Sequence, residues 1–253
     1  MNELEVIQFQ EISSNAWPAM NFILLNGWTI RVGDGYTRRA NSVLPVKYCG
    51  TDIHMDILSV ENLYQKFNLP SIFQIPDYCE PTNLKQLLLD RGYEEHDESL
   101  LMSQEISHLY SIEENNSYEY SIDVGSSDEW FINFGRLTNR THDKMIKNQN
   151  IVNRIPFQKA FAFARNDNEI VGLGLGVLER NFIGIYDMIV SSDYRRQGIG
   201  QSLIFYLIEW GKSHGATIAY LQVQGDNSGA IALYKKIGFI DRYHYRYLIK
   251  NNK

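Results

Sequence analysis

The residues with the clearest chemical potential form a glycine-rich turn at residues 191–200, SSDYRRQGIG. The turn lies between an apolar run that ends at Val190 and a helical pattern that begins near Gln201. Glycines at alternate positions before a helix leave several backbone N–H groups unpaired and directed at one point, where the helix dipole is positive. The turn therefore predicts an anion site that suits a pyrophosphate. Arg195 and Arg196 either add charge-assisted hydrogen bonds to the same anion or are solvated surface residues.

Two familiar phosphate motifs do not fit this turn. A nucleotide P-loop needs a Lys followed by Ser or Thr after the glycines, and neither pair follows here. The dinucleotide fingerprint needs a third glycine where this chain has Leu203. A second glycine-rich run, GLGLG at residues 172–176, lies inside a predicted strand with no helix after it, so it indicates close packing or a bulge.

A second motif, NSGAIALYKKIGF, follows at residues 227–239. In this order and at this spacing, the RxxGxG turn and the second motif resemble the GNAT superfamily of acetyl-CoA-dependent N-acetyltransferases. The resemblance covers about residues 118–253. It implies that the pantetheine arm of acetyl-CoA pairs with the strand before the turn and that the pyrophosphate binds the turn. The residues that it places at the cofactor are Met188, Ile189, Val190, Arg195, Arg196, Gln197, Gly198, Ile199, Gly200 and Asn227.

The resemblance also implies catalytic roles. Tyr234 matches the tyrosine that many members use as the general acid for the departing thiolate, but it shares an apolar helical stripe and could be a core residue. Asp187, on the strand before the turn, is the candidate general base, or else a structural carboxylate; Glu179 is the second choice. Asn227 could cap the second helix, contact the pantetheine arm, or do both.

The predicted reaction is transfer of an acetyl group from acetyl-CoA to a primary amine of a small molecule or of a peptide or protein N-terminus. A non-catalytic acyl-CoA-binding module is the alternative, because the general base is poorly defined. A degenerate interaction protein is a third possibility, against which the intact RxxGxG turn argues.

Periodicity predicts the elements that position these residues in the second half. Apolar runs predict an antiparallel meander of three strands, over residues 159–164, 170–179 and 182–190. Helical spacing predicts one helix from Gln201 and another at residues 230–237, which ends at Gly238 as a left-handed C-cap. A buried strand at residues 218–223 and an alternating tail complete an α/β (α+β) fold, a mixed and mostly antiparallel sheet flanked by helices.

The first half repeats part of this order. It predicts a helix at 15–25, a hairpin at 28–46 that turns at Gly33–Gly35, a helix at 56–67, a strand at 72–75, a helix at 84–90 and a strand at 98–105. The last three recur 146 positions later, so that Ile72 corresponds to Ile218 and Gly92 to Gly238. The repeat indicates a tandem GNAT-like fold, although strand, helix, Gly-aromatic, strand is also a common order.

This repeat divides the chain into residues 1–117, a diverged GNAT-like domain, and residues 118–253, the acetyl-CoA-binding catalytic domain, with a linker at 111–117. The first half has Leu88 where the second has Tyr234, and residues 52–54 are DIH where the second half has its glycine turn. One acyl-CoA site per chain is the consequence.

The predicted hairpin of the first half is rich in side chains typical of recognition surfaces, or of an ordinary polar hairpin packed on a partner domain. Its candidate substrate-binding residues are Trp28, Arg31, Tyr36 and Arg38. The arginines could bind a carboxylate on the acceptor, such as an amino acid or a peptide end.

Composition excludes several other classes of protein. The 253 residues carry a formal net charge of -6, the wrong sign for general binding of nucleic acid or anionic lipid. The two cysteines, Cys49 and Cys79, are expected to be buried thiols, and the six histidines lack metal-ligand spacing, so no metal is predicted. Because no signal peptide or membrane-spanning run is found, a cytoplasmic location is expected. A tandem copy favours a monomer over a homodimer.

Overall fold

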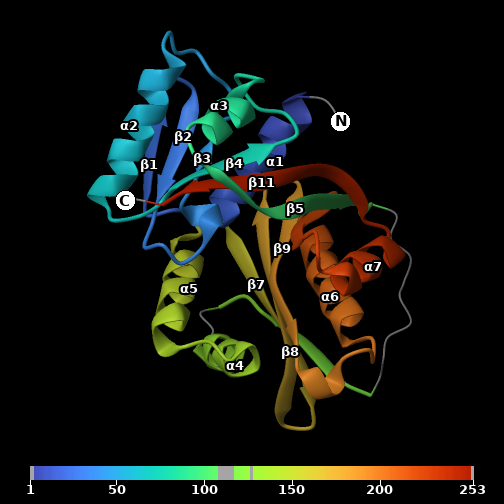
Figure 1. Ribbon diagram of the computed structural model, residues 1–253. Coiled ribbons are helices and arrows are strands. Elements are labelled where there is room, and N and C mark those ends of the chain that lie inside the picture. Colours follow the sequence, from blue (N-terminus) through green and yellow to red (C-terminus); the bar gives the residue numbers. More distant parts are fainter. Residues whose placement is uncertain (1–2, 108–116, 126–127, 252–253) are drawn as a thin grey trace. The chain divides into compact units, whose positions relative to one another are not determined.

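The computed structural model describes residues 3–107, 117–125 and 128–251 and divides into two compact units (Figure 1). Unit 1 comprises residues 1–101, 224–226 and 242–253, and unit 2 comprises residues 102–223 and 227–241. Each unit contains β-strands flanked by helices, which confirms the predicted fold class. The predicted linker lies outside the described residues except for Ser117. None of the helices in the described part of the chain has the length and apolar character needed to cross a membrane.

Unit 1 has the strand order β1-β2-β3-β4-β11, antiparallel except for the parallel pair β3–β4. Its elements are α1 (Glu3–Ala16), β1 (Asn21–Leu25), β2 (Trp28–Val32), a 3-10 turn (Arg38–Ala40), β3 (Val43–Leu44), α2 (Ile53–Lys66), β4 (Ser71–Pro76), α3 (Leu84–Asp90) and most of β11 (Ile240–Lys250). Strand β5 (Glu94–Glu105) begins in unit 1 and ends in unit 2. A core that includes Trp28, Ile57, Phe73 and Leu88 joins the sheet to α2 and α3.

The start of unit 1 differs from the prediction. The predicted helix at 15–25 is wrong, because α1 ends at Ala16 and residues 21–25 form β1, which pairs with β2. Asn26 and Gly27, between these strands, both have positive φ values of 47° and 91°. An Asn-Gly pair with two positive φ angles is the favoured two-residue hairpin turn, and this signal outweighs the helical spacing. The predicted hairpin exists as β2 paired with β3, but a loop with a 3-10 turn replaces its tight turn.

Unit 2 has the strand order β10-β9-β8-β7-β6, antiparallel except for the parallel pair β9–β10. Its elements are β6 (Glu119–Asp123), α4 (Asp128–Thr138), α5 (His142–Arg154), β7 (Gln158–Asn166), β8 (Glu169–Glu179), β9 (Phe182–Val190), a 3-10 turn (Ser192–Tyr194), α6 (Ile199–Ser213), β10 (Ile218–Gln224) and α7 (Ser228–Lys236). Figure 1 shows α4 and α5 on one side of β7, β8 and β9, and α6 on the other.

The two units share one connectivity. In each, an antiparallel meander of three strands leads to a helix and then to a strand parallel to the last strand of the meander. Helix α2 begins at Ile53 and α6 at Ile199, 146 positions later. The repeat found in the sequence therefore extends to the helix that follows the meander.

The glycine-rich run of β8 permits close packing of α6, as predicted. A Cβ atom at Gly172 would lie 2.9 Å from Ile199 Cγ2 and 3.0 Å from Leu203 Cδ1, and one at Gly176 would lie 3.0 Å from Leu207 Cδ2. The missing side chains let α6 approach the strand and fix the position of its N-terminus, where the glycine turn ends.

The Gly172→Ala variant is expected to lose about 1–3 kcal/mol of unfolding free energy, because its Cβ overlaps the branched side chain of Ile199. Urea denaturation of the full chain measures this loss. Gly229→Ala is the control, because a Cβ there meets nothing within 4 Å in helix α7 and should leave stability unchanged or raise it by up to about 1 kcal/mol. Equal effects of the two substitutions would contradict the packing account.

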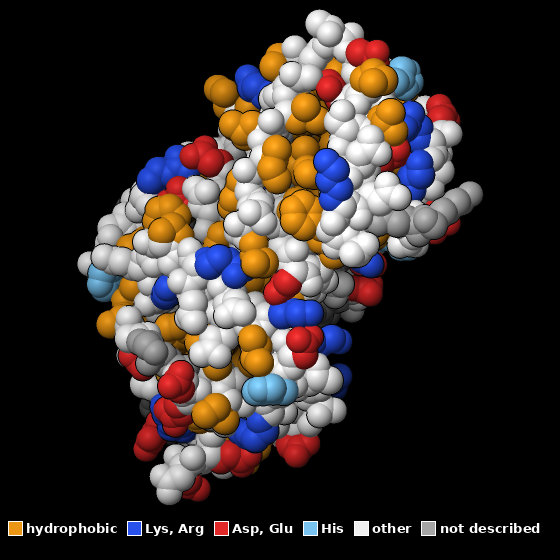
Figure 2. All heavy atoms as spheres, turned by 90° about the vertical axis from the view of Figure 1, so that its left-hand side faces the viewer, with side chains coloured by type: hydrophobic (Ala, Val, Ile, Leu, Met, Phe, Trp, Pro, Cys, Tyr) orange, Lys and Arg blue, Asp and Glu red, His pale blue; other side chains and the backbone are white. Residues whose placement is uncertain are grey.

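The surface carries charges of both signs. On the face drawn in Figure 2, basic and acidic side chains are interspersed. Several ion pairs join such neighbours, including Lys147 with Asp143 on α5 and Arg165 with Glu129 between β7 and α4. Exposed pairs of this kind contribute little to stability, about 0–1 kcal/mol each.

Candidate functional site

Strand β9 has an open edge next to the glycine turn. It pairs with β10 only from Phe182 to Ile185, and no residue beyond Ile185 is paired with β10 in the described part of the chain. On its other edge β9 pairs with β8 as far as Val190. Residues 188–190 at the end of β9 therefore have no strand pairing with β10, and an extended ligand could add there as a further strand, as the GNAT resemblance implies for Met188, Ile189 and Val190.

The turn after β9 ends in a helix N-terminus without a side-chain cap. Gly198 is the N-cap of α6 with φ 82°, and the first helical hydrogen bond runs from Ser202 N to Gly198 O. The N–H groups of Ile199 and Gly200 therefore precede the hydrogen-bonded part of the helix. Arg196 also has a positive φ, 61°. Alternating left-handed residues of this kind turn successive N–H groups toward one point, so the predicted anion site has the backbone it needs.

The side chains of the turn are arranged unequally around this backbone. Arg195 donates from Nε to the Val190 carbonyl oxygen at 3.2 Å, which fixes the start of the turn to the end of β9. Arg196 is exposed, and the Gln197 side chain bonds to Tyr118. Ile199 is buried beneath the turn against β8, so only its backbone is available to a ligand.

Helix α7 leaves an apolar face partly uncovered. None of its residues is fully buried, although Ala230, Leu233, Tyr234 and Ile237 recur with helical spacing. Leu233 is nearest to the turn, since its Cδ2 would lie 3.5 Å from a Cβ on Gly200. An amphipathic helix normally buries such a stripe. The open stripe beside the glycine turn therefore leaves an apolar surface for a ligand.

Two predicted site residues lie on α7 or at its start. Asn227 is the N-cap, and its Oδ1 accepts from Ala230 N at 3.2 Å, so the capping role is present and its amide nitrogen remains available. Burial raises the pKa of Tyr234 above its usual value. The Tyr234 hydroxyl has no hydrogen-bond partner within the described residues, and its ring lies 6.1 Å from that of Phe239. A protonated phenol without a partner is suited to donate a proton.

Asp187 lies at a bulge in β9. The register with β8 shifts between Leu173 and Leu175, and Asp187 has a positive φ of 47°. Its Oδ2 accepts from Asn148 Nδ2 at 2.9 Å, so it faces α5, whereas Met188 approaches Gly174 beneath α6. The bulge thus directs one carboxylate away from α6 at the position where β9 and β10 have separated.

Asn148 is the site residue that sequence reasoning missed. It is fully buried, and its Oδ1 has no hydrogen-bond partner among the described residues. An unpaired buried oxygen costs free energy unless a ligand or water satisfies it. Asn148 precedes the apolar residues Ile151 and Val152 by three and four positions, so the three side chains share one face of α5. A polar amide on this apolar face is the sequence signal that could have identified it.

Glu179, the second choice for a base, is the last residue of β8 and lies beside the end of β9 that is remote from the glycine turn. It pairs with Phe182, the first residue of that strand, whereas the glycine turn follows Val190, the last. At about 3.3 Å per residue this separation is roughly 25 Å, which removes Glu179 from the turn. The described residues include no cluster of metal-ligating side chains.

Unit 1 lacks the corresponding open backbone. The N-cap of α2 is Asp52, whose carboxylate accepts from His54 N and Met55 N at 3.1 and 3.2 Å and so neutralises the helix N-terminus. Glu80 N donates to the carbonyl oxygen of Pro45, just beyond β3, at 2.9 Å. In unit 1 the helix N–H groups are therefore bonded to Asp52, and the backbone just after β3 is bonded to Glu80.

The candidate substrate residues of unit 1 do not form one surface. Trp28 is fully buried and packs edge-on against Phe73, so it is a core residue, a correction that follows from its place on the inner face of β2. Arg31 is also buried. Tyr36 and Arg38 are partly exposed, and Arg38 pairs with Asp97.

The expectation of two buried cysteines is wrong for Cys49, which is exposed.

Comparison with known proteins identifies a matching family, a relative in sequence and several structures with a similar fold. The family described as probable histone acetyltransferase Rv0428c C-terminal matches residues 5–248. YobR of Bacillus subtilis strain 168, described as an uncharacterized N-acetyltransferase, is 30% identical over 247 residues, 96% of this chain and 98% of YobR. Among solved structures, a GCN5-related N-acetyltransferase from Kribbella flavida has a TM-score of 0.75 at 14% identity and 96% coverage of both chains. A tandem GNAT protein from the clavulanic acid biosynthesis pathway has a TM-score of 0.69 at 9% identity, covering 96% of this chain and 88% of its own. With its duplicated connectivity and open glycine turn, the chain belongs to the Rv0428c C-terminal family and is a GNAT N-acetyltransferase.

Proposed function

We propose that the chain transfers an acetyl group from acetyl-CoA to a primary amine of a small molecule or of a peptide or protein N-terminus, at a site in unit 2. The observation that carries the proposal is the open backbone of β9 followed by the uncapped N-terminus of α6. A cytoplasmic location and a monomeric state remain predictions of the sequence.

In this proposal acetyl-CoA lies along the end of β9 and the turn before α6. Its diphosphate would accept from the N–H groups of residues 196–200, and its pantetheine amides would pair with Met188 and Val190. Asn227 would supply its free amide nitrogen, and the half-exposed stripe of α7 would cover apolar parts of the arm. A backbone N–H near Val190 would stabilise the oxyanion that forms on the acyl carbonyl.

Tyr234 is the proposed general acid. The neutral amine attacks the thioester carbonyl, the carbon–sulfur bond breaks, and the phenol protonates the departing thiolate. The amide nitrogen then loses its extra proton, which restores the phenol. Because burial raises its pKa, the phenol keeps its proton throughout the neutral range. The base that first removes a proton from the ammonium form of the acceptor is proposed to be Asp187, held in place by Asn148.

The Asn148→Asp variant tests the base. A second carboxylate 2.9 Å from Asp187 disfavours ionisation of both, so it raises the pKa of the pair. Since the base acts only when deprotonated, the rise of kcat/KM with pH is expected to move upward by about one unit or more. Asn150→Asp, an exposed change on the same helix, controls for net charge and should not move the profile. An unchanged profile for Asn148→Asp would exclude Asp187 as the base.

The experiment that tests the function is release of free thiol from acetyl-CoA in the presence of a panel of primary amines, amino acids and short peptides. Each amine is paired with its tertiary N,N-dimethyl analogue, which cannot form a stable amide. Thiol release that requires the primary amine, with an acetylated product of the expected mass, supports the proposal. Acetyl-CoA binding without turnover across the panel would contradict it and favour a non-catalytic acyl-CoA-binding module.

A further inference from the structure

A buried arginine in unit 1 has no acidic partner among the described residues. Arg31, on β2, is 3% exposed, and its guanidinium donates to neutral groups. Its Nε donates to the backbone oxygen of Ser42 at 3.1 Å. Its Nη2 donates to the Ser42 hydroxyl at 2.6 Å and to Gln74 Oε1 at 2.7 Å. Nη1, the remaining guanidinium nitrogen, donates one long hydrogen bond of 3.4 Å to Ser14 Oγ, so part of its donor capacity remains unused.

Such a charge is unusual in a protein interior. Buried charges are normally paired, because desolvation of an isolated ion costs several kcal/mol. Burial lowers the pKa of Arg31, the nearby tyrosines Tyr247, Tyr64 and Tyr245 partly offset this effect, and Arg39 lowers the pKa further. Arginine nevertheless keeps its proton in proteins. The described surroundings of Arg31 therefore have a positive charge without a fixed anion.

A cavity reaches the neutral groups that surround this charge. It has a volume of about 430 Å³ between α1 and the sheet of unit 1, within the range of small-molecule sites. Ser14 lines it and accepts from Arg31, and Thr29 lines it from the same face of β2 as Arg31. Gln10 also lines it, is 2% exposed, and has an Nε2 without a partner among the described residues.

The rest of the cavity wall indicates the class of ligand. Ile7, Leu44 and Val46 give it an apolar part. The exposed side chains of Glu11 and Lys47 also line it, and Lys47 pairs with Glu3 at 3.6 Å. Two buried donors lack an acceptor, namely the Gln10 amide nitrogen and the second proton of Arg31 Nη1. A carboxylate on a short apolar chain would satisfy these donors, compensate the charge of Arg31 and cover the apolar residues.

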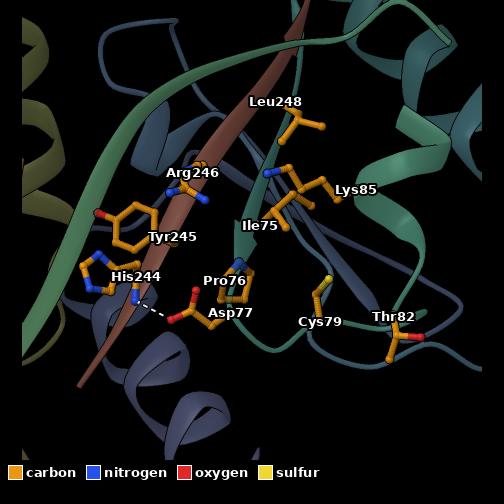
Figure 3. A pocket seen from close by; sticks show the side chains of 10 residues that line it. All are labelled: Ile75, Pro76, Asp77, Cys79, Thr82, Lys85, His244, Tyr245, Arg246 and Leu248. Carbon is orange, nitrogen blue, oxygen red and sulfur yellow. Dashed lines mark hydrogen bonds between the residues drawn. The ribbon is translucent and has the colours of Figure 1, made fainter. Parts of the chain in front are cut away.

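Another cavity of unit 1 is also lined by cationic side chains, but these have acidic partners. Figure 3 shows it between the end of β4, α3 and β11, with Asp77 accepting from His244 N at 2.9 Å. Its cations already have acidic partners, since Lys85 pairs with Glu95 at 2.7 Å and Arg246 with Glu95 at 3.0 Å. The cations of this second cavity therefore need no anion from a ligand, whereas Arg31 has only neutral partners.

We propose that unit 1 binds a small carboxylate with a short apolar chain in the cavity beneath α1, with Arg31 as its counter-charge and Gln10 and Ser14 as its polar contacts. The site belongs to a different unit from the acetyl-CoA turn and does not depend on the proposed function. Its test is run without acetyl-CoA, so failure of either proposal leaves the other standing.

The test compares 3-methylbutanoate with 3-methylbutanamide, two probes of nearly equal size that differ in charge. Thermal unfolding of the full chain is followed at rising probe concentration, with sodium chloride matching the ionic strength. At about 100 times Kd the carboxylate is expected to raise Tm by about 5 °C or more, and the amide by much less. No shift with the carboxylate, or equal shifts with both probes, would overturn the proposal.

A variant supplies the missing anion from the protein itself. Gln74→Glu places a carboxylate oxygen on the existing 2.7 Å contact with Arg31, and the Gln10 amide can then donate to it. The ligand-free variant is expected to gain about 2 °C or more in Tm and to lose the response to 3-methylbutanoate. Gln65→Glu, an exposed change on α2, is the charge control. A retained response in a folded Gln74→Glu protein would overturn the proposal, and the wild-type comparison decides it if the variant does not fold.

Discussion

Replacing Tyr234 by Phe is expected to lower kcat about 100-fold and to leave the affinity for acetyl-CoA within about twofold of the wild-type value. The substitution removes one hydroxyl group that has no protein partner in the described residues, so packing and stability should hardly change. General acid catalysis by a positioned side chain contributes about 10²–10⁴-fold to rate. Steady-state kinetics with a saturating amine, together with acetyl-CoA titration, separates the two quantities.

The control for this variant is Tyr206→Phe, the same chemical change on α6, where the ring stacks on Tyr120 at 5.2 Å. It should retain the wild-type kcat. A Tyr234→Phe enzyme with unchanged kcat would show that the tyrosine is only a packing residue of α7 and that the thiolate leaves without this acid.

Replacing Gly198 by Ala is expected to weaken acetyl-CoA binding at least about 10-fold, equivalent to about 1.4 kcal/mol. A Cβ on Gly198 would meet no described protein atom within 4 Å, so the substitution adds no steric clash within the protein. The left-handed φ of 82° strains an alanine by about 1–2 kcal/mol and loosens the N–H geometry of the turn. Isothermal titration of the purified variant measures the loss.

Gly215→Ala is a closely matched control. Gly215 follows the C-terminal end of α6 and has φ 95°, and a Cβ added there likewise meets no described atom within 4 Å. The backbone strain is therefore comparable, but no predicted ligand lies there. Equal losses of affinity in the two variants would mean that strain in α6, and not the phosphate turn, governs binding.

The second half of the chain could be predicted closely because its signals are local. The apolar run of β9 gives its bounds, residues 182–190, and helical spacing with the Gly238 stop gives α7. The phosphate turn follows from glycine positions next to a helix start. Helices α4 and α5 were not predicted. In α5 the few apolar residues are spread among many polar ones over residues 142–154.

The parts of the site that escaped prediction depend on three-dimensional packing. Alternation places Asp187 on the face opposite Met188, as found, but it does not foresee the bulge at this point of β9 or the buried Asn148 that Asp187 meets. Trp28 and Arg31 are residue types common in recognition loops, which is why the sequence suggested that role. Both lie on β2, which pairs with β1 across the Asn26-Gly27 turn, and both are buried. Whether a polar residue in a strand lies inside or outside is set by the helix that covers it, here α1.

The measurement that tests the central claim most directly is isothermal titration of the full wild-type chain with acetyl-CoA. The open backbone of β9 and α6 in unit 2, against the Asp52-capped helix of unit 1, predicts one site per chain. Micromolar binding with a stoichiometry of one is the expected result. Absence of binding, or two equivalent sites per chain, would contradict the account of the glycine turn as the single acyl-donor site.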